Sequence, residues 1–428
     1  MPKRNFLYLF IGGIIGIILI LFAVAIFTKP KPVKPTVISS PAVITPQVES
    51  PPVAQEEAPP LPVETPVTAE TPVTVEKETP PTAVTEEMAP ATAEVSEAEK
   101  ILKPEFHKGM IYVAWTENGY SNVNSVKAME QMSSLGVEWV GLVTTWYQEQ
   151  YNSTQISAIK DKTPSDESLI FAIRKLRELK FKIMLKPHLD LVESGGKWRG
   201  DIDFENPEEW QKWFDNYAAF ILHYVNIAAQ ENVELFCIGT ELTQATLGQS
   251  QSQHWRDLIN KIRLVYKGAL TYAANWHEEF NQIEFWDALD YAGIDPYFPL
   301  VCTMKPKVEE LKSAWLDWLK TIEAWQAKIN KPVILTEIGY KSSGDATDEP
   351  WQHVGMGKLD LELQSNCYQA LLETFWDKPW FYGAYWWYWG AHPNIGGPLN
   401  KGFTPQNKPA QEVVKEWYTN KPISQKTY

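Results

Sequence analysis

The 428-residue sequence is poor in cysteine, histidine and positive charge, and each shortage argues against a class of function. The three cysteines, Cys237, Cys302 and Cys367, form neither a disulfide framework nor the spacing of a zinc site. The seven histidines are dispersed, and no H-E-x-x-H motif occurs. We therefore expect no metal and no other cofactor. The formal net charge of −14 argues against nucleic acid as a partner.

Aromatic residues are missing from residues 29–104, although they make up 13% of the whole sequence. This stretch holds sixteen prolines and twelve glutamates in 76 residues. Such a composition cannot bury enough apolar surface to offset the entropy lost on ordering the chain. We expect residues 29–104 to form a disordered, stiff stalk rather than a small folded domain.

Charge is missing from residues 6–27, which are long enough to cross a bilayer as a helix. A signal peptide has a shorter apolar core, although residues 23–25, Ala-Val-Ala, resemble a cleavage site. We expect residues 1–28 to be a membrane anchor with a transmembrane helix, and the rest of the chain to be extracytoplasmic. Cleavage would instead give a secreted protein.

Residues 105–428 show a repeated pattern of apolar runs and helical stretches. The runs expected to be strands are 109–115, 137–146, 181–187, 233–240, 268–275, 290–295, 332–336 and 380–387. The expected helices are 124–134, 166–179, 207–230, 251–266, 308–329, 359–376 and 407–418. Asn124 or Ser125 is expected to cap the first of them.

Alternation of strands and helices predicts an α/β protein with a parallel sheet. Eight such units match a (β/α)₈ TIM barrel. The alternative is an open doubly wound sheet, which usually carries a glycine-rich phosphate turn after an early strand, and no such turn occurs.

Two of the predicted strands end in the same way. Thr240-Glu241 follows the fourth apolar run and Thr336-Glu337 follows the seventh. The active site of a TIM barrel lies at the C-terminal ends of its strands, where these two carboxyl groups could converge. A pair about 5–5.5 Å apart is the arrangement of a retaining glycosidase, with one acid/base and one nucleophile. We therefore expect Glu241 and Glu337 to be catalytic.

The other strand ends carry hydrogen-bonding and aromatic side chains that suit a sugar. The residues expected to bind substrate are Trp115, Trp146, Lys186, His188, Asn275, Asp295, Tyr297, Trp386 and Trp387. Trp115 and Trp146 could instead pack in the core, and Lys186 could pair with a carboxylate. Trp386 and Trp387 are adjacent, so at most one of them faces the cleft of a regular strand.

Three segments resemble the clan A glycoside hydrolases, and within that clan family 113, which is known for β-mannanases. They are Ile238-Gly239-Thr240-Glu241-Leu242, Asp295-Pro296-Tyr297 and Leu335-Thr336-Glu337-Ile338-Gly339-Tyr340. The resemblance covers about residues 107–420. It implies that Glu241 is the acid/base and Glu337 the nucleophile, that Tyr297 hydrogen-bonds the nucleophile, and that Trp386 or Trp387 is the sugar platform. Thr240 replaces the asparagine of the wider clan, which leaves a contact to the sugar 2-hydroxyl unassigned.

We expect a monomeric retaining endo-β-glycosidase that hydrolyses a β-1,4-linked polysaccharide, with mannan as the first expectation. The alternatives are a carbohydrate-binding barrel without catalysis and a clan A hydrolase of another β-glycan or cell-wall polymer. The paired carboxyl groups argue against the first alternative, because a binding module does not need both.

Overall fold

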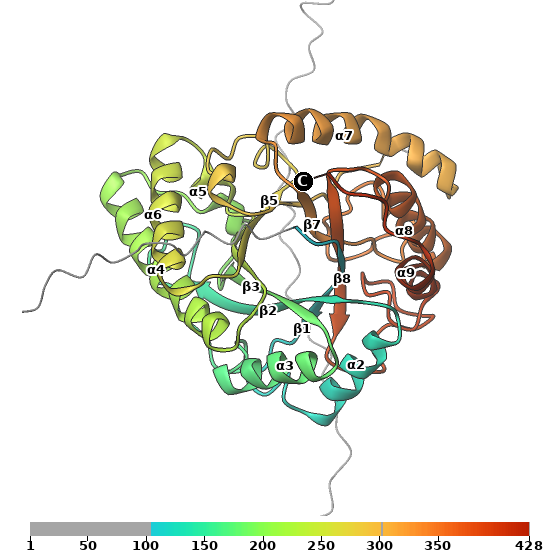
Figure 1. The fold of residues 1–428 in the computed structure, drawn as a ribbon, viewed down its shortest axis with the longest axis horizontal. Helices are drawn as coiled ribbons and strands as arrows, with labels where there is room; N and C mark the ends of the chain where they lie inside the picture. Colours follow the sequence, from blue (N-terminus) through green and yellow to red (C-terminus); the bar gives the residue numbers. More distant parts are fainter. Residues whose placement is uncertain (1–103, 301–302, 428) are drawn as a thin grey trace, which may run out of the picture. The chain divides into compact units, whose positions relative to one another are not determined.

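A ring of eight strands forms the centre of the structure, a computed structural model that describes residues 104–300 and 303–427. The predicted anchor at 6–27 and the predicted stalk at 29–104, apart from its last residue Pro104, lie outside these residues. The strands are β1 His107–Val113, β2 Trp139–Gln148, β3 Lys182–Leu191, β4 Leu235–Thr240, β5 Ala269–Asn275, β6 Ala292–Asp295, β7 Val333–Ile338 and β8 Phe381–Gly390. Helices surround them in Figure 1.

The helices follow the strands along the chain. They are α2 Val123–Ser133, α3 Asp166–Glu178, α4 Pro207–Gln230, α5 Thr243–Thr246, α6 Gln249–Val265, α7 Val308–Ile329, α8 Leu361–Phe375 and α9 Pro409–Asn420. Two 3₁₀ turns, η1 Arg199–Asp201 and η2 Trp286–Ala288, lie in loops. The seven predicted helices are present within two residues at each end, whereas α5, η1 and η2 are too short to leave a periodic signal in the sequence.

The strands pair in parallel in chain order, and β1 also pairs with β8, which closes the barrel. Gly109 in β1 lies opposite Trp139 of β2 and Tyr385 of β8. A Cβ atom at Gly109 would come within 2.6 Å of the Tyr385 ring. Glycine therefore leaves room for the tyrosine ring where the barrel closes. The predicted TIM barrel is confirmed.

The starts of α2, α3, α4 and α8 have a side-chain cap, and one of these caps differs from the expected residue. Asn206 caps α4, which begins with Pro207. The expectation that Asn124 or Ser125 caps α2 is wrong. Asn122 is the cap, and its side-chain oxygen accepts from the N–H groups of Asn124 at 3.0 Å and Ser125 at 3.1 Å. A cap precedes the N–H groups that it satisfies, so the helix starts one residue earlier than predicted.

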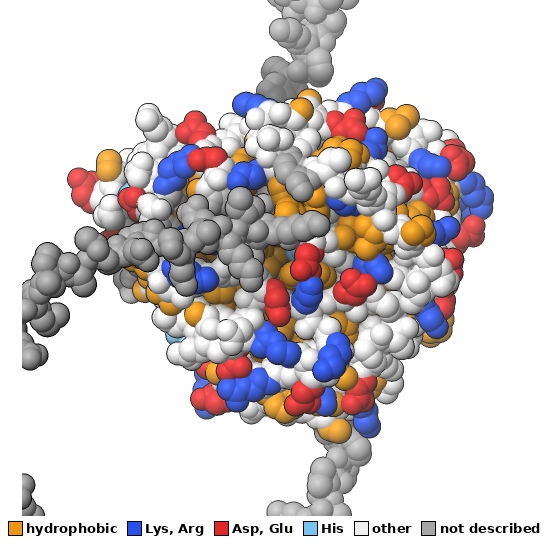
Figure 2. All heavy atoms as spheres, viewed as in Figure 1, with side chains coloured by type: hydrophobic (Ala, Val, Ile, Leu, Met, Phe, Trp, Pro, Cys, Tyr) orange, Lys and Arg blue, Asp and Glu red, His pale blue; other side chains and the backbone are white. Residues whose placement is uncertain are grey.

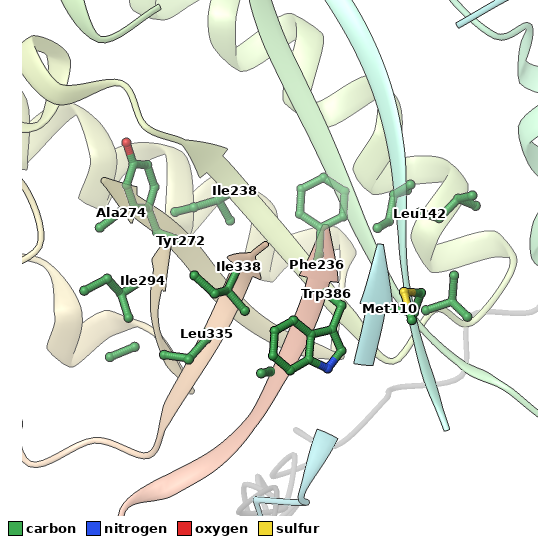
Figure 3. Packing of buried hydrophobic residues seen from close by; sticks show 14 of the residues in the cluster. Met110, Leu142, Phe236, Ile238, Tyr272, Ala274, Ile294, Leu335, Ile338 and Trp386 are labelled. Carbon is green, nitrogen blue, oxygen red and sulfur yellow. The ribbon is translucent and has the colours of Figure 1, made fainter. Parts of the chain in front are cut away.

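Buried apolar side chains form two clusters because neighbouring residues of a strand point to opposite faces. The smaller cluster gathers residues that fill the barrel, such as Ile111, Met184 and Ile334. The larger one joins the outer faces of the strands to the helices, and Figure 3 shows part of it, including Phe236 and Trp386. Inward positions near the strand ends are polar instead, and these positions form the site.

Charged side chains of both signs are interspersed around the edge of the face shown in Figure 2. Among the residues described, none of the helices combines the length and the apolar character that a membrane span needs.

Candidate active site

The two glutamates expected to be catalytic lie at the ends of β4 and β7. Glu337 is the next-to-last residue of β7, and Glu241 directly follows β4. Glu241 has a φ of 51°, a left-handed conformation that costs a non-glycine residue about 1–3 kcal/mol. Its N–H donates to the carbonyl of Ala273 at 2.8 Å. The chain turns sharply here, and both carboxyl groups line one cavity.

Glu337 is held by two donors, Lys186 of β3 and Tyr297 just after β6. Lys186 Nζ donates to its Oε2 at 2.8 Å, and the Tyr297 hydroxyl donates to its Oε1 at 2.8 Å. Burial raises the pKa of Tyr297 well above its ordinary value, and the charge of Glu337 adds to this. Tyr297 therefore keeps its proton, and the orientation of the Glu337 carboxyl group is fixed.

Lys186 lies between two carboxyl groups inside the barrel. Its side chain and that of Asp295 are completely buried, and Lys186 Nζ lies 3.3 Å from Asp295 Oδ2. Burial lowers the pKa of Lys186, but the charges of Asp295 and Glu337 outweigh burial and raise it above its ordinary value. Burial raises the pKa of Asp295, Lys186 opposes this, and Glu337 adds to it. One cation is thus shared by two carboxyl groups.

Glu241 has a different environment. The Asn275 side chain at the end of β5 donates to its Oε1 at 2.8 Å. Burial raises the pKa of Glu241, the positive charge of Arg199 opposes this, and the negative charge of Glu337 adds to it. Glu241 therefore holds a proton to higher pH than an ordinary glutamic acid, as a general acid must.

Arg199, in the turn η1 after β3, brings a positive charge to the cavity. Its Nε and Nη2 donate to Asp190 Oδ1 at 3.1 and 2.7 Å. Burial lowers the pKa of the neighbouring His188, and the charges of Arg199 and Lys186 add to this, so the imidazole stays neutral. The buried His188 Nε2 has no hydrogen-bond partner among the described residues.

The cavity has a volume of about 490 Å³ and a largely aromatic wall. Trp276 and Trp351 stack with their ring centres 5.1 Å apart. The rings of His188 and Trp387 are nearly parallel, with centres 6.2 Å apart. Flat aromatic faces beside carboxyl and amide groups suit a sugar, which has apolar faces and hydroxyl groups at its edges.

Most of the residues expected at the site come together there. Besides the two glutamates, the cavity is lined by His188, Asn275, Tyr297 and Trp387. Lys186 and Asp295 do not line it, because both are completely buried. Lys186 nevertheless contacts Glu337 from inside the barrel. Thr240 is also buried, and the side-chain contact to Glu241 comes from Asn275.

Three predicted tryptophans lie away from this cavity. Trp386 is fully buried and stacks on Tyr368 of α8 at 3.8 Å, so it belongs to the outer core. Trp146 donates from its ring nitrogen to the Tyr224 hydroxyl of α4 at 2.7 Å. Trp115 is 46% exposed and meets the edge of the Tyr388 ring. The alternative that Trp146 packs against the protein agrees with this placement.

Several lining residues were not expected from the sequence. They are Asp190, Trp198, Arg199, Trp276, His277, Trp351, Gln352, His353 and Phe403. Asp190, Trp276 and His277 lie at or just beyond strand ends, where the rule that found Asn275 could have found them. Trp351 and Phe403 come from the long loops after β7 and β8, and a strand-end pattern carries no signal for them. Among the described residues, no group of His, Cys, Asp or Glu could hold a metal ion.

The fold is similar to that of known glycosidases. A solved structure of a GH113 β-1,4-mannanase matches with a TM-score of 0.66 at 26% identity, covering 74% of this chain and 100% of that one. A GH113 β-mannanase of Alicyclobacillus acidocaldarius matches with the same TM-score and identity, covering 74% and 97%. A Faecalibacterium prausnitzii β-glucuronidase shares the fold alone, with a TM-score of 0.53 at 14% identity, covering 75% of this chain and 50% of that one.

No curated protein sequence gives a significant match. The model of Glycoside Hydrolase Family 113 matches residues 110–408, which is more than half of the sequence. The strand-end glutamates, the closed barrel and this match agree: the chain belongs to glycoside hydrolase family 113.

Proposed function

We propose that this protein is a retaining endo-β-1,4-mannanase that works by double displacement. The observation that carries the proposal is that Glu241 and Glu337 line one cavity in unlike surroundings. Glu337 accepts from Lys186 and Tyr297, whereas burial raises the pKa of Glu241. Two carboxyl groups with different environments are what this mechanism requires.

Glu337 is the nucleophile in this proposal. Its carboxylate attacks the anomeric carbon and displaces the leaving sugar, which gives a covalent glycosyl-enzyme. Lys186 and Tyr297 fix the direction of attack, because each holds one carboxylate oxygen. Glu241 protonates the departing oxygen, and the resulting carboxylate then takes a proton from the water that releases the sugar. Asn275 holds Glu241 in place during both steps.

Mannan is the proposed substrate because the solved family members at 26% identity are described as β-mannanases. Trp387 rather than Trp386 is the proposed sugar platform, since Trp387 lines the cavity and Trp386 is buried. His188, which lines the cavity with a neutral imidazole, is the proposed contact for a sugar hydroxyl. A panel of mannan, glucan and xylan, with product sizes measured over time, tests the substrate and the endo mode of attack.

The roles of the two glutamates are tested by two substitutions that should lower activity in different ways. We expect Glu337→Ala to lower turnover by about 10⁴-fold or more. Added azide should restore some activity and give an α-glycosyl azide, because azide then replaces the carboxylate. We expect Glu241→Ala to keep the glycosylation of a dinitrophenyl β-mannoside, whose leaving group needs no proton. Azide should then give a β-glycosyl azide.

The stereochemistry of the product distinguishes this retaining mechanism from an inverting one. NMR of the first product should show the β-anomer, which is the result of retention. An α-anomer would mean inversion and would remove Glu337 as a nucleophile. Wild-type activity in Glu337→Ala would show that the site is placed wrongly.

We also propose that residues 6–27 hold the barrel outside the cytoplasm, at a membrane surface. The support is the uncharged run of the sequence and the polymeric substrate, which is found outside the cytoplasm.

A further inference from the structure

A third buried carboxyl group, that of Glu279, lies close to the cavity without lining it. Glu279 follows β5 and is completely buried. Its Oε2 accepts from the N–H of Asn275 at 2.6 Å. Its Oε1 accepts from the hydroxyl groups of Tyr272 at 2.6 Å and Thr246 at 3.1 Å. The proposed chemistry gives this residue no step, although it is costly to bury.

The contacts of Glu279 lead to Glu241 by two routes. On one side, the Asn275 side chain donates to Glu241 Oε1 at 2.8 Å. On the other, the Tyr272 hydroxyl accepts from the N–H of Leu242 at 2.9 Å, and Leu242 directly follows Glu241 in the chain. The hydrogen bonds therefore close a ring through Glu279, Asn275, Glu241, Leu242 and Tyr272.

This ring of hydrogen bonds stabilises a backbone conformation that is unfavourable by itself. Glu241 has a left-handed φ of 51°, so its own preference favours another conformation. Strained backbone persists where its surroundings determine it. The ring fixes the backbone on the C-terminal side of Glu241 through Leu242, and it fixes the carboxyl group through Asn275.

We propose that Glu279 is a positioning residue for the acid/base Glu241. It sets the direction in which Glu241 presents its proton to the leaving oxygen, and it does not touch the substrate. The inference rests on the proposed function, because it assigns Glu279 to the proton-transfer half of that mechanism. Nucleophilic attack by Glu337 does not depend on it.

The test compares two kinds of leaving group in the full-length chain. In Glu279→Gln an NH₂ group replaces one acceptor oxygen, and in Tyr272→Phe the hydroxyl is lost. For either variant we expect kcat/KM on mannan to fall about tenfold to a hundredfold, because general acid catalysis depends on alignment. We expect kcat/KM on a dinitrophenyl β-mannoside to stay within about twofold, since that leaving group departs without a proton.

Tyr266→Phe is a matched control. Tyr266 is also a buried tyrosine, and its hydroxyl donates to the Val233 carbonyl at 2.8 Å, at the opposite end of β4 from Glu241. Tyr266→Phe should leave unchanged the ratio of kcat/KM on mannan to kcat/KM on the dinitrophenyl β-mannoside. If Glu279→Gln does not fold, Tyr272→Phe alone decides the matter.

An equal loss on both substrates, or no loss on mannan, would overturn the proposal. Failure of the proposed function gives a different result. It would appear as a wild type that does not cleave mannan, or as a Glu337→Ala variant that keeps its activity. If the wild type cleaves another β-glycan, the same ratio is measured with that glycan and its dinitrophenyl glycoside.

Discussion

Arg199 lies where its charge acts on the proton of Glu241. Its guanidinium group is paired with Asp190 and lines the cavity with both glutamates. Burial raises the pKa of Glu241, and Arg199 is the strongest influence that lowers it. The arginine therefore limits how far burial can raise that pKa.

We expect Arg199→Gln to raise the pKa of Glu241. In the proposed mechanism activity needs protonated Glu241, so activity is present below that pKa and lost as the pH rises through it. The basic limb of the kcat/KM profile should therefore move to higher pH. The unpaired charge of Asp190 would act in the same direction. A profile of kcat/KM against pH measures the shift, even if the maximum rate falls.

Arg256→Gln is the control for Arg199→Gln. Arg256 forms an ion pair with Asp287, whose side chain is 69% exposed, and it does not line the cavity. Its removal should leave the basic limb in place. An unchanged limb in Arg199→Gln would contradict the electrostatic role given to Arg199.

At the scale of elements, β8 presents two adjacent tryptophans to different surroundings. Trp386 is fully buried against α8, and Trp387 is partly exposed in the cavity. We expect Trp386→Ala to lower the free energy of unfolding by about 3–5 kcal/mol, because it opens a cavity in the outer core. Denaturant unfolding measures this change.

Trp387→Ala should act mainly on function. We expect kcat/KM on mannan to fall about tenfold or more, from the loss of an aromatic face, with a smaller effect on stability. Equal stability losses in the two variants would contradict the opposite orientations of these side chains.

The same strand shows what could be predicted from the sequence. Apolar runs bounded by polar residues predicted all eight strands, because a parallel strand that is buried on both faces is a nearly continuous apolar run in the sequence. Alternation along a strand showed that only one of Trp386 and Trp387 could face the cavity, but the choice depends on the pairing register. Arg199 and Trp351 lie on loops whose course is set by tertiary packing, so no local pattern predicts them.

At the scale of the whole molecule, the barrel should act without the residues that precede it. We expect the intact chain to sediment with membranes. A protease should cut within residues 29–104 and release a soluble barrel with unchanged kcat/KM on mannan. Fractionation before and after digestion, with mass spectrometry of the N-terminus, measures both. A natural N-terminus at Ile26 would instead indicate secretion, and an uncut stalk would contradict the predicted disorder.

The sharing of Lys186 between Asp295 and Glu337 has a consequence for the proposed reaction cycle. When Glu337 forms an ester with the sugar, its negative charge disappears, and Asp295 is the carboxyl group that remains beside Lys186. The loss of that charge also removes one cause of the raised pKa of Asp295. The ionised form of Asp295, whose Oδ2 lies 3.3 Å from Lys186 Nζ, is thereby favoured. The pair of Lys186 and Asp295 would keep the barrel interior close to electroneutral until water hydrolyses the covalent intermediate.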